Sequence, residues 1–563
     1  MMDKRKSRKM MGQTSSASKQ VDNSNQKKML QGSFWMTAGS LMSRILGALY
    51  VIPWVAMFGS FWLQGNALFS KGYNIYSLFL MASTAGVPSA VSKLVARYNA
   101  QQEYNLAFRL YKKSLQIGLV TGFIAAGVLW FGAPWLAAGD VNVIPVLHSL
   151  APAVFVIPVM SMTRGFLQGN NQMAASAMSQ FIEQLVRVIY MLFMTWMLLI
   201  LNNGAWQDAV VQSTFAAFVG ALGGIAVLAW TLWRQRNWFI LKKQESLDQI
   251  KISEKSLIWQ VVKQAIPFVI VGSAIQIYQI IDQYSFFKIM QIFSDFSYDM
   301  LNRQYAIFDF NANKLIMIVI SLAVALGTTA IPLLAAAHVR KNNDEIASQI
   351  RFTLELFMFV MIPAAIGMAA IAQPLYVTFY GYDSALEALS GTLILQFSSF
   401  LGIMFGLFTL LSTITQGVSR NDIALKALFY GVLLKLTLQI PAVALLGAMG
   451  PLVASMGGFL LASGYILYGL QKIYQLKLEQ CVMTLNWVTF AALIMGGVSF
   501  GITQGMLLFV SSTSRLMQIM IIIMAVSLGG LVYSYIMLKT KIPDQLLGNR
   551  VAMLRRKLRI KLK

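Results

Sequence analysis

Long apolar runs separated by short polar segments dominate the chain. Each run is close to the roughly 20 residues that an α-helix needs to cross a bilayer. The pattern predicts an all-α polytopic membrane protein with about fourteen transmembrane helices. The predicted helices cover residues 33–58, 72–96, 110–131, 143–166, 176–201, 209–233, 258–287, 308–337, 352–372, 389–415, 422–446, 450–471, 484–509 and 516–538. About thirty polar and basic residues precede the first run, too many for the start of a signal peptide, so we expect an uncleaved spanning helix there.

The composition excludes most soluble classes of protein. Of the 563 residues, 57% are hydrophobic and 12% are charged, against roughly 25% charged in a typical soluble domain. One cysteine, Cys481, and two histidines, His148 and His338, are too few for a disulfide framework or a thiolate or imidazole metal site. The sequence also has no phosphate-binding loop, zinc-protease or serine-hydrolase motif. We therefore expect no metal, no cofactor and no enzymatic reaction.

The net charge of +24 lies largely outside the apolar runs. Residues 1–30 hold eight Lys or Arg, residues 234–256 hold six and residues 539–563 hold nine, which is 23 of the 45 in the chain. Loops at the opposite ends of the predicted helices are instead acidic, with Asp140, Asp208, Asp295, Asp299, Asp383 and Glu387. The positive-inside rule then places both termini in the cytoplasm and the acidic loops at the outer end. Basic tails there are attracted to anionic phospholipids, so the charge indicates no nucleic-acid partner.

The basic linker divides the predicted helices into six before it and eight after it. A weak internal repeat supports this division, because Gln168-Gly169 after the fourth run matches Gln416-Gly417 after the tenth. Two six-helix bundles related by a pseudo-two-fold axis along the membrane normal are typical of transporters, with the substrate between them. The predicted segments are a basic tail (1–31), a first bundle (32–233), a linker (234–257), a second bundle (258–471), a terminal helix pair (472–538) and a basic tail (539–563).

Charged residues inside the apolar runs are the best candidates for function, since each is costly in a membrane unless it is paired or solvated. Arg44, Arg187 and Lys435 lie near the middle of their runs, and the repeat aligns Arg187 with Lys435. Further basic candidates lie nearer the inner ends (Lys93 and Arg164) or the outer ends (Lys314) of their runs. Acids within the runs are fewer: Glu183, Asp282, Asp309 and Glu355.

A cavity lined by these bases would suit an anionic substrate, and phosphate or diphosphate is the natural candidate. One alternative stays open at this point. Glu183 and Arg187 are four residues apart on one predicted helix, so they could form an ion pair with a structural role only.

Four segments, residues 39–47, 72–76, 85–94 and 323–334, resemble motifs of the MurJ-type lipid II flippases in the MATE-like and polysaccharide-exporter superfamily. Residues 39–47 (GSLMSRILG) resemble the first-helix motif, and residues 323–334 (AVALGTTAIPLL) resemble the helix 8 signature. Residues 72–76 (GYNIY) and 85–94 (AGVPSAVSKL) look like the Gram-positive YtgP and SpoVB branch. The resemblance implies a multi-pass protein of a Gram-positive cell membrane, active in peptidoglycan biosynthesis and the maintenance of cell shape.

The resemblance also implies a substrate, a mechanism and site residues. Family members move undecaprenyl-diphosphate-linked peptidoglycan precursor (lipid II) to the outer leaflet by alternating access, and their last two helices form a groove for the lipid tail. Arg44 matches the first family arginine. The second Arg and the following Asp of the Gram-negative motif fall on Tyr50 and Val51, and the helix 8 arginine falls on Asn313, beside Lys314. The Gram-negative gating residues are therefore only partly present.

Other functions are weighed against this one. A flippase for another undecaprenyl-linked polysaccharide fits the same features, whereas a MATE-type multidrug cation antiporter is disfavoured by the shortage of mid-membrane acids. A membrane scaffold would not need buried bases, and a membrane glycosyltransferase would need a larger soluble loop than the linker. Coupling to a monovalent cation or to the membrane potential is left open.

Overall fold

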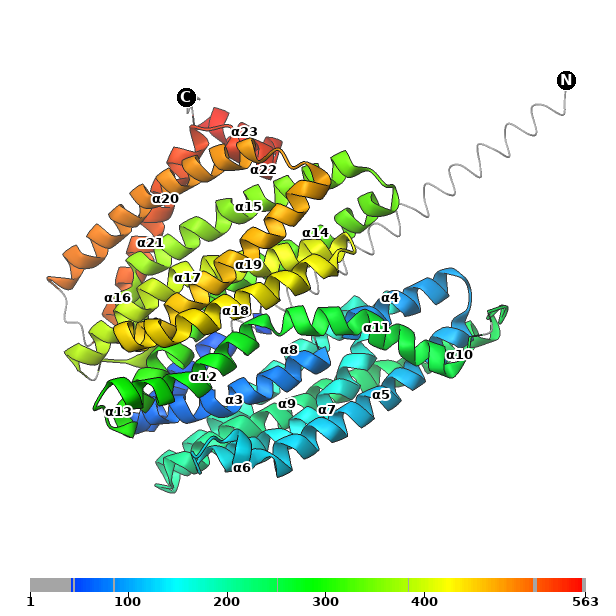
Figure 1. Ribbon diagram of the computed structural model, residues 1–563, viewed down its shortest axis with the longest axis horizontal. Helices are drawn as coiled ribbons and strands as arrows, with labels where there is room; N and C mark the ends of the chain where they lie inside the picture. Colours follow the sequence, from blue (N-terminus) through cyan, green and yellow to red (C-terminus); the bar gives the residue numbers. More distant parts are fainter. Residues whose placement is uncertain are drawn as a thin grey trace.

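The computed structural model describes residues 42–43, 46–84, 87–250, 252–382, 384–509 and 514–558 (Figure 1). The tail of residues 1–31, Arg44 and Asp383 lie outside these ranges. The described residues form helices and no strands. This confirms the predicted all-α class, as expected for long apolar segments whose backbone groups must bond within the segment.

The helices before the linker form what we call the first half, Leu46 to Arg234. They are α2 (Val51–Phe58), α3 (Trp62–Thr84), α4 (Val87–Ala100), α5 (Tyr104–Phe131), α6 (Ala133–Leu136), α7 (Val143–Gly169), α8 (Met173–Trp196) and α9 (Trp206–Arg234). The 3-10 turn η1 (Gly59–Phe61) follows α2, and the π-helical turn η2 (Met197–Leu201) extends α8. Helix α10 (Arg236–Gln244) belongs to the linker.

We call the helices from α11 to α19 the second half. They are α11 (Glu254–Gly272), α12 (Ala274–Phe293), α13 (Tyr298–Tyr305), the π-helical η3 (Ala306–Ala312), α14 (Asn313–Val339), α15 (Asn343–Ala370), α16 (Ala372–Tyr380), α17 (Ala385–Gly417), α18 (Asn421–Leu446), η4 (Gly447–Met449) and α19 (Gly450–Tyr474). The chain ends with α20 (Leu478–Leu507), α21 (Arg515–Leu538), α22 (Ile542–Leu547) and α23 (Asn549–Lys557).

Eleven segments of the described residues are long and apolar enough to cross a membrane, or up to twelve if the bent pair α11–α12 is one span. The predicted number of fourteen is therefore not confirmed. One of the eleven, Asn421–Tyr474, is 54 residues long and contains both α18 and α19. These two helices lie side by side in Figure 1 and are joined at Gly447, whose φ of 56° suits a residue without a Cβ.

The two halves lie against each other along their length in Figure 1, with α20 and α21 packed on the far side of the second half. Helix α3 of the first half contacts α12, α13 and η3 of the second, and α2 contacts α16. Helix α11 contacts α4 and α5 near the other end. Helix α3 is therefore the element of the first half that faces the second half most directly, and it positions the site.

Candidate functional site

A polar cavity of about 120 Å³ lies between the two halves. Helix α3 lines one side, and α12, η3 and the start of α14 line the other. The polar and charged residues that line it are Ser70, Asn74, Ser77, Gln276, Gln279, Asp309, Asn313 and Lys314, with Phe69, Tyr73, Phe310 and Met317 as the aromatic and apolar part. Because it contacts both halves, a molecule bound here would respond to any change in their relative position.

A polar stripe on α3 builds the first-half wall of this cavity. Asn66, Ser70 and Asn74 are spaced four residues apart and so share one helix face. Ser70 Oγ donates to Asp309 Oδ2 at 2.5 Å, and Asn74 Nδ2 donates to the same oxygen at 2.7 Å. Asn66 Nδ2 donates to Asn311 Oδ1 at 2.7 Å. The bonds from Ser70 and Asn74 therefore stabilise the Asp309 carboxylate, which has no basic partner among the described residues.

Lys314 lies within a group of aromatic rings on the cavity wall. Its Nζ is 5.3 Å from the ring centres of Tyr73 and Phe310, and 5.7 Å from those of Tyr50 and Phe69. Ammonium groups are attracted to ring faces at such distances, by about 0.5–2 kcal/mol each. Among the described residues, no carboxylate lies within ion-pair distance of Lys314. The ammonium therefore keeps its capacity for an anion.

Arg187 on α8 approaches the same tyrosine from the first half. Its Nη1 lies 3.5 Å from Tyr73 Oη, and its guanidinium carbon lies 5.2 Å from the centre of that ring. Gly220 on α9 permits this position, since an added Cβ there would lie 2.8 Å from the Cβ of Arg187. Tyr73 is thus within 5.3 Å of a cation from each half, Arg187 of the first and Lys314 of the second.

The pairing of Glu183 decides the alternative that the sequence left open. Glu183 Oε2 accepts a bond from Nη2 of Arg164 on α7 at 2.7 Å, and no ion pair joins Glu183 to Arg187 among the described residues. Arg164 also donates to Ser179 Oγ from Nε at 3.1 Å and from Nη2 at 2.8 Å. Arg164 is therefore buried in an ion pair, and Arg187 is left without a carboxylate.

The remaining basic candidates do not join the cavity. Lys435 is 0% exposed and pairs with Asp282 Oδ1 at 2.7 Å, with Ser455 Oγ at 2.6 Å as a second acceptor. This pair lies among α12, α18 and α19 inside the second half. Lys93 is exposed on α4. The structure thus brings together Arg187 and Lys314, places Arg164 and Lys435 in separate ion pairs, and leaves Arg44 outside the described residues.

Lys71 is an important residue that the sequence analysis did not select. Its Nζ bonds to Asp140 Oδ2 at 2.7 Å, to Asn302 Oδ1 at 2.7 Å and to Tyr298 Oη at 3.1 Å. Asp140 belongs to the first half, whereas Tyr298 and Asn302 lie on α13 of the second. We call these four residues the Lys71 cluster; it joins the two halves at the predicted outer end. The polar stripe of α3 could have indicated Lys71. This stripe begins before residue 72, where the predicted apolar run starts, so Lys71 fell outside the run.

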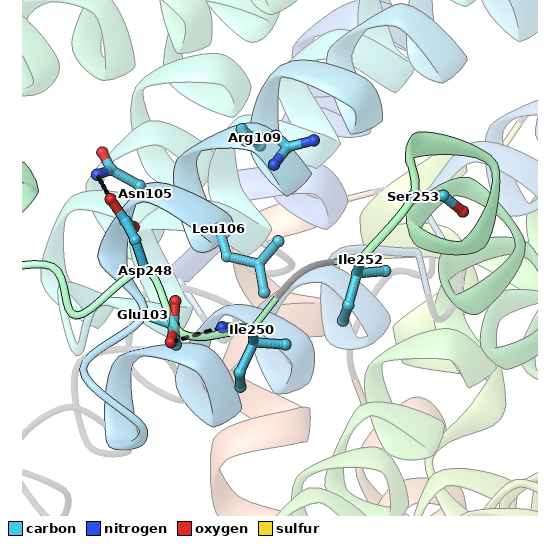
Figure 2. Close-up of a pocket in the computed structure, with 8 residues that line it drawn as sticks. All are labelled: Glu103, Asn105, Leu106, Arg109, Asp248, Ile250, Ile252 and Ser253. Carbon is cyan, nitrogen blue, oxygen red and sulfur yellow. Dashed lines mark hydrogen bonds between the residues drawn. The ribbon is translucent and has the colours of Figure 1, made fainter.

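A second pocket, of about 560 Å³, lies where the linker docks on the first half (Figure 2). Glu103 Oε1 accepts from the backbone N of Gln249 at 2.7 Å and of Ile250 at 3.0 Å, and Asn105 donates to Asp248 at 2.9 Å. Hydrogen bonds from Ser246 and Asn105 lower the pKa of Asp248. The charged residues that line this pocket are Glu103, Asp248 and Arg109, and two of them bond to the linker or belong to it. Its evident role is to hold the linker.

A helical membrane protein of two halves with a polar cavity between them has the architecture of a polytopic transporter. The chain belongs to the family of polysaccharide biosynthesis proteins, whose model matches residues 29–338. It is 35% identical over 547 residues to the lipid II flippase MurJ of Bacillus subtilis (strain 168), a match that covers 93% of this chain and 97% of that protein.

Solved structures agree with this fold. The chain matches a lipid II flippase MurJ in an inward closed conformation with a TM-score of 0.60 and 14% identity, over 88% of this chain and 98% of that one. It matches an outward-facing multidrug resistance MATE family transporter with a TM-score of 0.58 and 14% identity, over 79% of this chain and 96% of that one. The predicted MurJ-type relationship is confirmed by the 35% identical relative, and the fold is shared with the MATE transporters.

Proposed function

We propose that this protein is a flippase that moves lipid II, the undecaprenyl-diphosphate-linked peptidoglycan precursor, from the inner to the outer leaflet by alternating access. The 35% identical relative is itself a lipid II flippase, which supports the substrate. The observation that carries the proposal is the pair of basic residues at Tyr73, Arg187 and Lys314, neither with a carboxylate partner among the described residues.

The chemistry of a diphosphate matches this arrangement. A guanidinium can hold two phosphate oxygens with parallel hydrogen bonds, while an ammonium contributes a compact point charge. An unpaired cation at membrane depth is costly, so these two groups favour a bound anion or water. Gln276 Oε1 and Asn313 Oδ1, both in the cavity wall, are buried without a partner among the described residues and could accept bonds from a sugar or peptide donor.

Arg187 and Lys314 also come from different halves, on α8 and α14. A diphosphate between them would bind both halves at once, and its binding would depend on how close they are. This dependence is what alternating access requires, since a ligand shifts an equilibrium only when it binds the two states differently. Arg44, which matches the first arginine of the family motif, is proposed as a third basic residue of the same site.

Further properties follow as part of this proposal. Both termini are cytoplasmic, the basic tails contact anionic phospholipids, and the six segments of the chain are divided as predicted from the sequence. The cycle is coupled to a monovalent cation or to the membrane potential, and no covalent change is made to the substrate. The host is a Gram-positive bacterium.

The test is complementation in a host whose own lipid II flippases can be depleted. The wild-type chain should restore growth and prevent lipid II from accumulating in the inner leaflet, measured by mass spectrometry of extracted lipids. Arg187→Ala and Lys314→Ala should each weaken function, because a hydrogen bond to a charged group contributes about 1.5–3 kcal/mol, or about 10- to 100-fold in affinity. Lys93→Ala, which removes an exposed lysine, is the matched control and should be silent.

Two results would count against the proposal. Full complementation by the Arg187→Ala/Lys314→Ala double variant at normal abundance would show that the two cations do not bind the substrate. Accumulation of a different undecaprenyl-linked glycan in the native host would favour the second candidate, a flippase for another polysaccharide unit, which the description of the matching family also fits.

A further inference from the structure

Arg187 has no ion pair in the structure because the neighbouring carboxylate, that of Glu183, bonds to a different arginine, Arg164. Glu183 lies one helical turn before Arg187 on α8, and a Glu four residues before a basic residue is a favourable arrangement for an ion pair. In the structure Glu183 bonds instead to Arg164 on α7 at 2.7 Å. The same acid thus has two basic neighbours, and only one of them is paired.

Several contacts fix Arg164 as the preferred partner. Nε and Nη2 of Arg164 both donate to Ser179 Oγ, and that hydroxyl in turn donates to the backbone oxygen of Gly224 at 3.0 Å. Arg164 is 8% exposed, so its guanidinium is held in one place by packing as well as by hydrogen bonds. Gly224 allows this close packing, since an added Cβ would lie 2.9 Å from Met160 Sδ and 3.3 Å from both Arg164 Nη2 and Glu183 Cβ.

We propose that Arg164 is a positioning residue, which holds Glu183 away from Arg187 and so keeps the Arg187 guanidinium available to an anionic substrate. With Arg164 in place, Arg164, Glu183 and Arg187 carry a net charge of +1, and Arg187 presents this charge beside Tyr73 of the cavity wall. Without Arg164, Glu183 would turn toward Arg187 and neutralise it. The inference rests on the proposed function, and it assigns to Arg164 a role that does not require contact with the substrate.

The test compares binding of undecaprenyl diphosphate, presented in detergent micelles, to purified full-length variants of similar abundance. Arg164→Gln should weaken binding about tenfold, which corresponds to about 1.4 kcal/mol. Glu183→Gln should bind at least as well as wild type, because Arg187 then has no competing acid. The Arg164→Gln/Glu183→Gln double variant should bind within about threefold of Glu183→Gln. Arg340→Gln, which breaks an exposed Arg–Glu pair in a loop, is the matched control.

The outcomes separate this inference from the proposed function. Wild-type protein that fails to bind undecaprenyl diphosphate, or Arg187→Gln that binds it normally, would refute the proposed site. Normal binding by Arg164→Gln together with a loss in Arg187→Gln would refute only the role of Arg164. If Arg164→Gln does not accumulate, the comparison of Glu183→Gln with the double variant still decides. A double variant about tenfold weaker than Glu183→Gln would mean that Arg164 acts by itself, and would overturn the inference.

Discussion

The Lys71 cluster predicts how the equilibrium between two states of this protein can be shifted. Lys71 is 4% exposed and has two neutral oxygen acceptors besides its ion pair with Asp140, whose side chain is 13% exposed. Two of its partners are on α13 of the second half. Lys71→Met would therefore remove two of the bonds that join the halves at the predicted outer end, and it would leave Asp140 with the hydrogen bond from Tyr298 at 3.2 Å but without its basic partner.

The magnitude follows from the two bonds to α13, because the Lys71–Asp140 ion pair lies within the first half and is kept when the halves part. A hydrogen bond from a charged group contributes about 1.5–3 kcal/mol, so the loss of both bonds to α13 costs about 3 kcal/mol or more. A change of about 3 kcal/mol corresponds to more than 100-fold in an equilibrium constant. The arrangement in which the halves are in contact at the outer end should be destabilised by this free energy relative to the arrangement in which they separate there. Lys71→Met should therefore populate the outward-open arrangement.

Spin labels at two exposed positions can measure this shift. Phe131 at the end of α5 and Leu445 at the end of α18 are 78% and 83% exposed, and they lie in different halves. With the single cysteine removed by Cys481→Ser, electron-electron distances between labels at these positions should lengthen in Lys71→Met. Lys242→Met, which breaks an exposed ion pair on α10, should leave them unchanged. An unchanged distance distribution in abundant Lys71→Met protein would refute the reasoning.

Three further predictions concern packing, the second ion pair and topology. Gly220→Ala should lower stability by about 1–3 kcal/mol, because its Cβ would lie 2.6 Å from the carbonyl oxygen of Glu183 on α8. The measurement is thermal unfolding followed by size-exclusion chromatography. Gly127→Ala is the control and should be tolerated, since a Cβ there would have no neighbouring atom within 4 Å. Lys435→Met should lower stability by about 3–5 kcal/mol in the same measurement, since it leaves the buried Asp282 carboxylate without its basic partner. A stability equal to that of the wild type would contradict this prediction. A cysteine at Val141 should react with an impermeant thiol reagent added to intact cells and one at Lys243 should not; the reverse pattern would invert the topology.

The sequence predicts the helices well because apolar length is a direct signal of a membrane span. Each predicted run falls on one or more helices of the described residues, although the number of spans is not settled by length and composition. The main difference is at α3, which begins at Trp62 rather than at residue 72. Its first turns carry Asn66, Ser70 and Lys71, which lower the local hydropathy. These residues are buried against the other half, and a hydropathy pattern cannot distinguish that burial from exposure to water.

The sequence selects basic candidates for the site but not their pairing. Depth in an apolar run is enough to select Arg44, Arg187 and Lys435, and the excess of bases over acids predicts an anionic substrate. Which base is free depends on contacts between helices far apart in sequence. Glu183 pairs with Arg164 nineteen residues before it rather than with its neighbour on the same helix. No pattern along one helix contains that information.

Arg187 and Lys435 differ in ion pairing, and the difference determines which of the two bases is available to an anion in the proposed site. The repeat aligns the two residues, on α8 and α18, yet Lys435 is neutralised by Asp282 of α12 while Arg187 contacts Tyr73 of the cavity wall. The cation that the second half presents to the cavity is instead Lys314 of α14. The two cations therefore come from non-equivalent helices of different halves, and both lie close to the ring of Tyr73. Under the proposed function, a diphosphate is bound best when both halves approach it and loses one cation when they separate, so its affinity should change with the same motion that would carry it across the membrane.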